Sequence, residues 1–151
     1  MQTDEYQLEL GWQGDGGLGV RLIQQVLDGC KTATCGPKSE FTEKELAATM
    51  ASKGKIVPVV DPEGRAWCHV RMIDVFETTF GHPDLRLVRG EGDGDDVEKF
   101  KLDHMGVWTD EMAAAGHPLT DETVLIVEEF ELVEGTEKPQ PLSSSSDASQ
   151  R

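Results

Sequence analysis

Apolar residues recur along this chain with two different periods. Around 18–28 they fall three or four positions apart, which places them on one face of a helix. Across 65–79 they recur at every second position, which is typical of a strand, and both faces of that strand carry apolar side chains. The run is long enough that we expect a bend or bulge near 73–75. Together with end signals, these patterns predict helices at 18–28, 42–52 and 95–115 and strands at 31–35, 55–60 and 65–79.

Glycine and capping residues mark the ends of these elements. Gly29 follows the first helix at a position that favours a left-handed backbone, and glycine adopts that conformation without steric cost. Thr42 and Glu45 have the spacing of a capping box at the start of the second helix. In the third helix, we expect a break near Gly106. The sequence Asp-Pro-Glu-Gly at 61–64 predicts a tight turn between two strands.

Strands joined by short turns favour a small mixed β-barrel that has helices at its sides. The length of 151 residues is that of one domain, which we place at 1–134. The remaining segment, 135–151, is rich in proline and serine and carries almost no apolar side chains. Because such a segment buries too little apolar surface to offset the entropy of ordering, we expect a disordered tail there.

Charge limits the kind of partner that this chain can bind. Its 29 acidic and 14 basic residues give a formal net charge of −15, and the pI is about 4.5. Binding of long nucleic acids depends on lysine and arginine side chains that neutralise phosphates, and a surface this acidic repels a polyanion. The composition therefore favours a small nucleoside or nucleotide ligand, with single-stranded RNA as an alternative partner.

The cysteines and the N-terminus bear on where the protein works. Cys30, Cys35 and Cys68 are an odd number without a disulfide framework, so we expect reduced thiols. The first ten residues show neither the basic segment nor the apolar run of a secretion signal. No segment approaches the ~20 apolar residues of a membrane span. We therefore expect a cytoplasmic protein that does not bind membranes.

Four short pieces of the chain resemble the ASCH-domain family, and they occur in the family's order. The segment 29–34 resembles the family's Gly-x-Lys-Thr-x-Thr element, and its continuation, Lys-Thr-Ala-Thr-Cys, is similar to the compact bacterial branch. The segments 65–80, 89–93 and 123–133 resemble the central strand, the glycine–glutamate element and the closing strand. The resemblance covers 18–134 and implies an α+β fold, a small mixed PUA-like β-barrel flanked by helices.

The resemblance also implies a catalytic site. Enzymes of this fold that hydrolyse N4-acetylcytidine use the motif's lysine, its second threonine and a later glutamate, and these positions match Lys31, Thr34 and Glu91. The threonine would attack the acetyl carbonyl, the lysine would take its proton, and the glutamate would orient groups or shuttle protons. Because strand positions three apart face opposite sides, Lys31 must still belong to the turn after Gly29 if it is to meet Thr34.

Other side chains of the matching pieces are candidates for ligand binding. They are Thr32, Arg71, Arg89 and Trp67. The arginines would hold phosphate, and the tryptophan would stack on a base. The family's amidohydrolases carry an arginine two positions after the threonine, where this chain has Gly36, so the substrate stays open. Three functions remain: hydrolysis of an N-acylated pyrimidine nucleoside, capture of a nucleotide or RNA end without chemistry, and cleavage of single-stranded RNA.

Histidines and cysteines are present, but their spacing along the chain predicts no metal site. His69, His104 and His117 can be grouped with Cys30 and Cys35, yet these spacings fit no zinc template. Two cysteines five positions apart are also a weak signal for a metal. The sequence therefore predicts neither a bound metal nor a cofactor.

Overall fold

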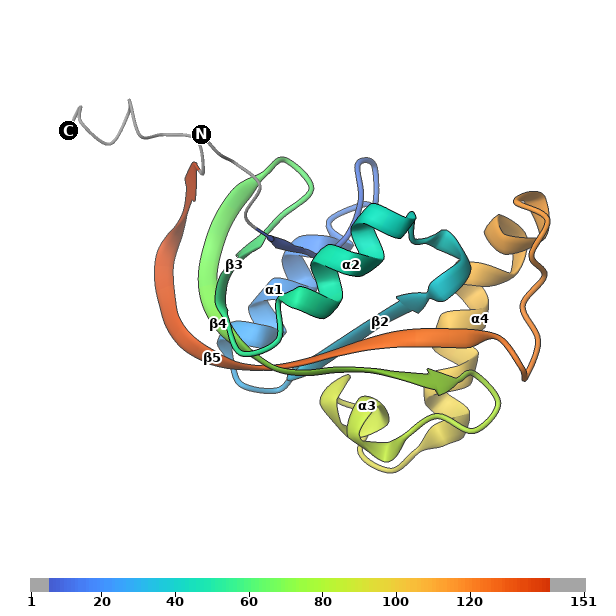
Figure 1. Cartoon of the computed structure of the whole chain (residues 1–151). Helices are drawn as coiled ribbons and strands as arrows, with labels where there is room; N and C mark the ends of the chain where they lie inside the picture. Colours follow the sequence, from blue (N-terminus) through green and yellow to red (C-terminus); the bar gives the residue numbers. More distant parts are fainter. Residues whose placement is uncertain (1–5, 142–151) are drawn as a thin grey trace.

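The structure is a computed structural model that describes residues 6–141 (Figure 1). Its strands in this range are β1 (Leu8–Glu9), β2 (Ala33–Pro37), β3 (Ile56–Val60), β4 (Arg65–Thr79) and β5 (Val124–Pro141). Its α-helices in the same range are α1 (Leu18–Leu27), α2 (Glu43–Ala51), α3 (Leu85–Gly90) and α4 (Val97–Ala114). A short 3₁₀ helix at Lys38–Glu40 follows β2.

The five strands form one mixed sheet in the order β1-β3-β4-β5-β2. β1 runs parallel to β3, and each of the other neighbouring pairs is antiparallel. The two long strands β4 and β5 bend strongly, so the sheet curls into a half-barrel (Figure 1). The expected α+β architecture is thereby confirmed, with a barrel that stays open between its two edge strands, β1 and β2.

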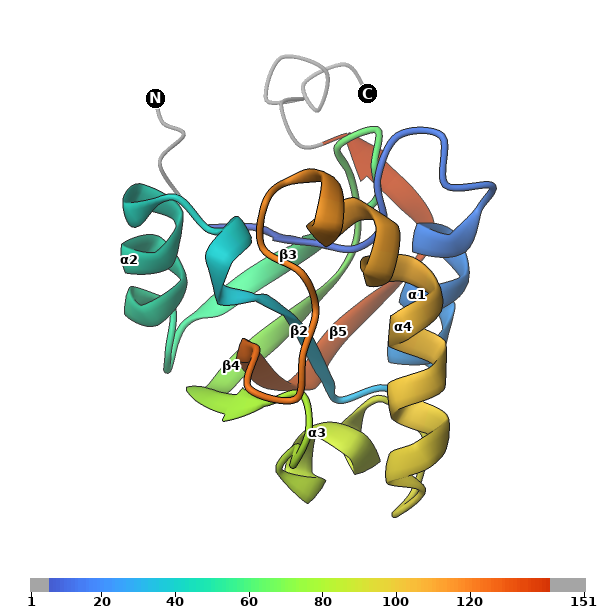
Figure 2. The same ribbon diagram turned by 90° about the vertical axis from the view of Figure 1, so that its right-hand side faces the viewer.

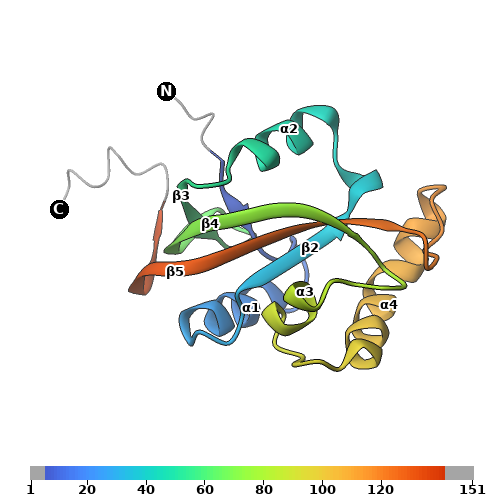
Figure 3. The same cartoon turned by 60° about the horizontal axis from the view of Figure 1, so that its bottom comes forward.

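Helices cover both faces of the curled sheet. α2 lies on one side, and α1 and α4 lie on the other (Figures 2 and 3). The core around α1 consists of Leu8, Leu10, Ile23, Val26, Val57, Val59, Cys68, Val70, Met72 and Phe130. The core around α3 and α4 consists of Ala33, Phe80, Leu87, Val88, Phe100, Trp108, Met112, Leu125 and Val127. Burial of these two apolar clusters fixes α1 and α4 relative to the sheet.

The local signals of the sequence are confirmed at several element ends. Thr42 accepts a hydrogen bond from the Glu45 amide, and the Glu45 side chain accepts one from the Thr42 amide, which is the expected capping box of α2. Gly29 has a φ of 82° after α1. The register of β4 against β5 shifts between Met72 and Asp74, within the region where the sequence predicts a bulge. These positions set the exit from α1 and the bend of β4.

The predicted break in the third helix is wrong, because α4 runs unbroken over Val97–Ala114 and includes Gly106. Phe100, Trp108 and Met112 of this helix are buried. Their packing outweighs the roughly 1 kcal/mol that glycine costs in a helix. Although α4 is the longest helix of the described residues, neither it nor another helix there is long and apolar enough to cross a membrane.

β5 extends beyond the predicted domain boundary. Its last residues continue the ladder with β4 as far as the pair Arg65 and Pro141. The boundary expected at 134 therefore falls inside a strand, because the start of β4 offers backbone groups that need partners. The rest of the predicted tail, 142–151, lies outside the described residues, so its expected disorder stays a prediction.

Candidate functional site

A cleft of about 720 Å³ is bordered by α1, α4, β2 and the segment that follows β1. Figure 2 shows α1 and α4 on the same side of β2. Small-molecule sites have volumes of about 300–1,000 Å³, so the cleft is large enough for a nucleoside. Its lining includes Lys31, Thr34 and Glu91, together with Cys35 and His104. The three predicted catalytic residues thus border one cleft.

Lys31 lies in the turn between α1 and β2, and its side chain is buried. Gly29 ends the helix with a left-handed backbone, and the Lys31 amide then donates to the Gln25 carbonyl at 3.1 Å. The Lys31 ammonium donates to the carbonyl oxygen of Ala33 at 2.9 Å and to Oε1 of Glu91 at 3.0 Å. Only 2% of the residue is exposed, so this charge is compensated inside the protein rather than by water.

Glu91 follows α3 directly and reaches Lys31 because α3 packs closely on β2. A Cβ atom at Gly90 would lie 2.4 Å from the Cβ of Ala33, so this approach requires glycine. Burial by itself would raise the pKa of Glu91, but the charge of Lys31 and a hydrogen bond from His104 lower it to about 2. The side chain is therefore a carboxylate at neutral pH.

His104 reaches the same carboxylate from α4. Its Nδ1 lies 2.8 Å from the Phe100 carbonyl oxygen, which can only accept, so Nδ1 carries a proton. Its Nε2 lies 3.5 Å from Oε2 of Glu91. The imidazole packs against the rings of Phe100 and Trp108, with centroids 4.2 and 4.8 Å away. Burial lowers the pKa of His104, but the hydrogen bond and charge of Glu91 raise it above its ordinary value.

Cys35 reaches Glu91 from β2. Its Sγ lies 3.6 Å from Oε2 of Glu91. Burial and the negative charge of Glu91 raise the pKa of Cys35 well above its ordinary value, so the thiol keeps its proton and donates it. Cys35, Glu91 and His104 thereby bring three potential ligand atoms to within 4.8 Å of one another.

Thr34 borders the cleft from the edge of the sheet. It pairs with Glu128 of β5, whereas its neighbours Ala33 and Cys35 face the opposite side of β2. Because β2 is an edge strand, side chains from both of its faces border the cleft. Among the described residues, no protein group hydrogen-bonds the Thr34 hydroxyl. Lys31 belongs to the turn as expected, but its ammonium bonds to Ala33 and Glu91 rather than to Thr34. This hydroxyl is available to a ligand.

The two arginines with a predicted ligand-binding role lie outside the cleft. Arg71 on β4 pairs with Glu131 of the neighbouring strand, with Nε 3.3 Å from Oε2. Arg89 in the last turn of α3 pairs with Asp95. Both side chains are half-exposed, and neither is among the described residues that line the cleft. The structure therefore does not bring these arginines to the site.

Trp67 and Thr32 also lie away from the cleft lining. The Trp67 indole donates to Oδ2 of Asp61 at 2.9 Å, which ties the ring to the turn between β3 and β4. Thr32 is exposed, and its amide donates to the Gly90 carbonyl at 2.7 Å. The backbone of Thr32 therefore helps to hold α3 against β2, while its side chain takes no part in the cleft.

Sequence reasoning does not select Cys35 and His104 as partners of Glu91. The three side chains come from β2, the end of α3 and α4, so no local spacing connects them. One signal does exist on α4, where His104 lies four residues after Phe100 and four before Trp108, on the buried face. A polar side chain in such a position needs a polar partner.

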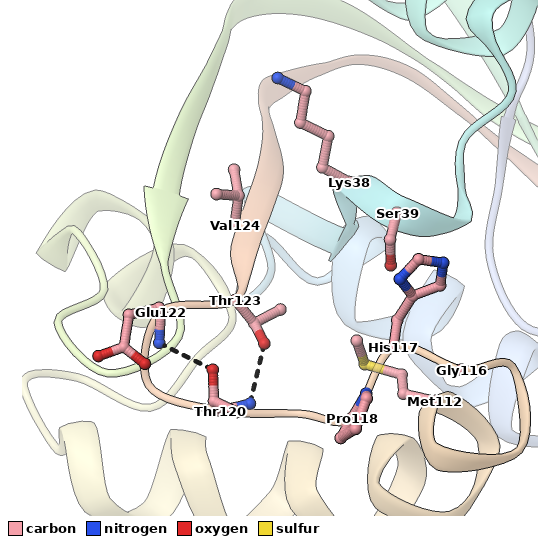
Figure 4. A pocket seen from close by; sticks show the side chains of 10 residues that line it. All are labelled: Lys38, Ser39, Met112, Gly116, His117, Pro118, Thr120, Glu122, Thr123 and Val124. Atoms are coloured by element: carbon pink, nitrogen blue, oxygen red, sulfur yellow. Dashed lines mark hydrogen bonds between the residues drawn. The ribbon is translucent and has the colours of Figure 1, made fainter.

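A second hollow, of about 520 Å³, lies beside the loop that follows α4 (Figure 4). The hydroxyl oxygens of this loop stabilise a local turn. Thr123 Oγ1 accepts from the Thr120 amide at 2.9 Å, and Thr120 Oγ1 accepts from the Glu122 amide at 3.1 Å. The predicted catalytic and ligand-binding residues do not line this hollow. The cleft beside Lys31 is therefore the candidate site.

The chain matches the family model described as the ASCH domain over residues 14–134. It resembles the crystal structure of an Enterococcus faecalis V583 protein assigned to DUF984, with a TM-score of 0.70, 19% identity, and coverage of 89% of this chain and 80% of that one. It also resembles an ASCH domain from Lactobacillus crispatus JV V101, with a TM-score of 0.67, 18% identity, and coverage of 85% and 80%. These two similarities show a common fold. No curated protein matches the chain.

Proposed function

Because the chain belongs to the ASCH-domain family, we propose that its cleft binds a pyrimidine nucleoside and hydrolyses an N-acyl group from the base, as in N4-acetylcytidine. The observation that carries the proposal is the convergence of Lys31, Thr34 and Glu91 on one cleft. Lys31 and Glu91 are in direct contact, with Nζ 3.0 Å from Oε1. A hydroxyl, an amine and a carboxylate together supply the nucleophile and the proton carriers that amide hydrolysis needs.

The charges of the cleft favour an uncharged nucleoside over a nucleotide or RNA. The acidic residues of its lining are Glu9, Glu40, Glu91, Asp93, Asp103 and Glu111. The lining lysines are Lys31 and Lys99, and both already pair with carboxylates. A phosphate group would meet net repulsion here, whereas a nucleoside would not. The indole of Trp108 also borders the cleft and offers an aromatic surface to a base.

The proposed reaction begins with proton transfer from Lys31 to Glu91, which leaves a neutral amine. The amine takes the hydroxyl proton as Thr34 attacks the acyl carbonyl, and the proton then passes to the base nitrogen as the amide C–N bond breaks. Water cleaves the acyl–threonine ester, which releases a carboxylic acid and restores the hydroxyl. The low pKa of Glu91 opposes the first transfer, so the substrate must displace part of this network before reaction.

Capture of a nucleoside without hydrolysis is the second candidate. It is favoured by the same ion pair, because Lys31 Nζ contacts the Glu91 carboxylate and the Ala33 carbonyl rather than the Thr34 hydroxyl that it would have to deprotonate. Within such a cleft, a bound base would still gain hydrogen bonds and aromatic contact. Cleavage of single-stranded RNA has less support, because the acidic lining disfavours its phosphates.

Steady-state hydrolysis of N4-acetylcytidine tests the proposal. Lys31→Met and Thr34→Ala should each lower the rate by at least about 100-fold, whereas Thr34→Ser should keep part of it because a hydroxyl remains. Thr32→Ala is the matched control, since this exposed threonine lies two positions away and outside the cleft. Full activity in the Lys31 variant would remove its catalytic role, and binding without turnover in the unmodified protein would favour capture.

The stability of the Lys31 variant needs its own control, because Lys31 is buried against Glu91. Leaving that carboxylate without its cation costs roughly 3–5 kcal/mol of folding free energy. The double variant Lys31→Met, Glu91→Gln removes both charges and should regain most of this stability in thermal unfolding. If activity stays lost in the double variant while stability returns, loss of fold does not explain the loss of activity.

A further inference from the structure

Cys35, Glu91 and His104 carry three kinds of side chain that bind zinc, and we propose that they form a zinc site with its fourth position open to the cleft. Thiolate sulfur, imidazole nitrogen and carboxylate oxygen are the usual protein ligands of Zn²⁺. Their nearest potential ligand atoms all lie within 4.8 Å of one another. The proposal goes beyond the hydrolysis proposed above and rests on separate atoms: Sγ, Nε2 and Oε2.

The spacing of these atoms suits a shared cation. Zn–S bonds of about 2.3 Å and Zn–N or Zn–O bonds of about 2.0–2.1 Å place tetrahedral ligands roughly 3.3–3.6 Å apart. The observed separations are 3.6 Å from Cys35 Sγ to Glu91 Oε2 and 3.5 Å from His104 Nε2 to the same oxygen. Two of the three separations therefore match those between ligands of one ion, and the third, between Cys35 Sγ and His104 Nε2, is at most 4.8 Å.

The surroundings of the ligands provide an independent argument. A metal-binding histidine almost always donates its other ring N–H to a carbonyl or carboxylate. His104 does so through Nδ1, 2.8 Å from the Phe100 carbonyl oxygen, and this leaves Nε2 for the metal. Rings on either side hold the imidazole in place. Lys31 occupies Oε1 of Glu91 and leaves Oε2 for the ion, so zinc binding preserves the observed ion pair.

Charge and access determine the type of site. Zinc binding displaces the thiol proton of Cys35 to solvent, and the resulting thiolate and the Glu91 carboxylate together balance the two charges of the ion. All three ligands line the cleft; the side chains of His104 and Glu91 are only slightly exposed, and Cys35 is partly buried. Three protein ligands with an open fourth position are typical of catalytic rather than structural zinc. The fourth ligand would be water or an oxygen or nitrogen atom of a molecule in the cleft.

Titration of the reduced, chelator-free protein with Co²⁺ tests this site directly, because a thiolate-to-cobalt charge-transfer absorption reports a Co–S bond. We expect one equivalent of Co²⁺ to bind, and Zn²⁺ to displace it. Cys35→Ser should abolish the charge-transfer band, and His104→Gln should weaken binding by more than the roughly 10- to 100-fold typical of losing an outer partner. Cys30→Ser is the matched control, since Cys30 is exposed and borders the same cleft.

The outcomes separate the two proposals. Lys31→Met should keep the charge-transfer band while losing nucleoside hydrolysis, because Lys31 is not a ligand. Metal binding without hydrolysis in the unmodified protein would overturn only the proposed reaction. The zinc site would be overturned by a band that survives Cys35→Ser, by a band that requires Cys30, or by no saturable binding. Metal that binds without a charge-transfer band, on the acidic surface, would also overturn it.

Discussion

Two buried ionisable residues, Lys31 and Glu128, differ in whether an opposite charge lies beside them. Lys31 and Glu128 are both buried, with 2% and 7% of their surfaces exposed. Lys31 contacts the Glu91 carboxylate and is compensated as an ion pair. The Glu128 carboxyl accepts a hydrogen bond from the Tyr6 hydroxyl, and in the described residues it has no cationic partner. Burial raises the pKa of Glu128 more than the Tyr6 hydrogen bond lowers it.

Because Glu128 is buried without a cation beside it in the described part of the chain, its titration should make the free energy of unfolding depend on pH. Its pKa in the folded protein lies above the ordinary value of 4.5, so the folded state holds the proton more tightly than the unfolded chain does. The free energy of unfolding therefore falls as the pH rises through the window above 4.5. Glu128→Gln should be more stable than the unmodified protein at pH 8 by roughly 1 kcal/mol, and about equal to it at pH 4. Urea unfolding at both pH values measures this, and an equal difference at the two pH values would contradict it.

Candidate site residues could be named from the sequence only where they stand in a piece that resembles a family motif. Lys31, Thr34 and Glu91 follow from the family resemblance, and the structure places all of them at one cleft. His104 reaches Glu91 only through the packing of α4, which spacing along the chain does not reveal. Arg71 lies in a matching piece, but its place in the motif does not determine which way it faces, and it points to Glu131.

At the scale of elements, close packing of α3 on β2 brings Glu91 to Lys31. The contact depends on Gly90, because an added Cβ would lie 2.4 Å from the Cβ of Ala33. Gly90→Ala should therefore push α3 away from β2 and destabilise the fold by roughly 1–3 kcal/mol. Gly106→Ala in α4 is the matched control, since nothing lies within 4 Å of its added Cβ. The control should stabilise the protein by about 0.5–1 kcal/mol.

Thermal unfolding measures both effects: the midpoint should fall for Gly90→Ala and rise for Gly106→Ala. Equal effects would mean that the approach of α3 to β2 tolerates a methyl group. If α3 moves as expected, the Gly90 variant should also lose the proposed nucleoside hydrolysis, because Glu91 moves away from Lys31. The Gly106 variant should keep it, since that glycine faces solvent on α4.

Elements were predictable where the pattern was local. α1 carries helical periodicity, α2 carries a capping box, and β4 carries alternation on either side of its bulge, so the sequence predicts all three. The extent of β5 depends on a partner strand rather than on its own residues, which is why the expected boundary at 134 falls inside it. The short strand β1 could not be predicted for the same reason, because its two residues form a strand only by pairing with β3.

At the scale of the whole molecule, net charge governs the choice of partner. A formal charge of −15 leaves little attraction for a polyanion, and acidic side chains outnumber lysines in the lining of the cleft. Unrelated single-stranded RNA should therefore bind no tighter than about 1 μM at physiological salt, with affinity that falls steeply as salt rises. A filter-binding assay measures this, and submicromolar binding that is insensitive to salt would contradict it.

Because β2 lies at the edge of the sheet, the candidate site can open locally without unfolding of the whole domain. This strand pairs in the sheet with β5 alone among the described strands. It carries Thr34 and Cys35, and it begins two residues after Lys31. Detachment of one ladder can therefore dismantle the cleft while the β3–β4–β5 sheet stays folded. Edge segments of this kind open with less free energy than the whole domain. A molecule or ion that bridges β2 to α3 and α4 raises that opening energy, so occupancy and local order are thermodynamically linked.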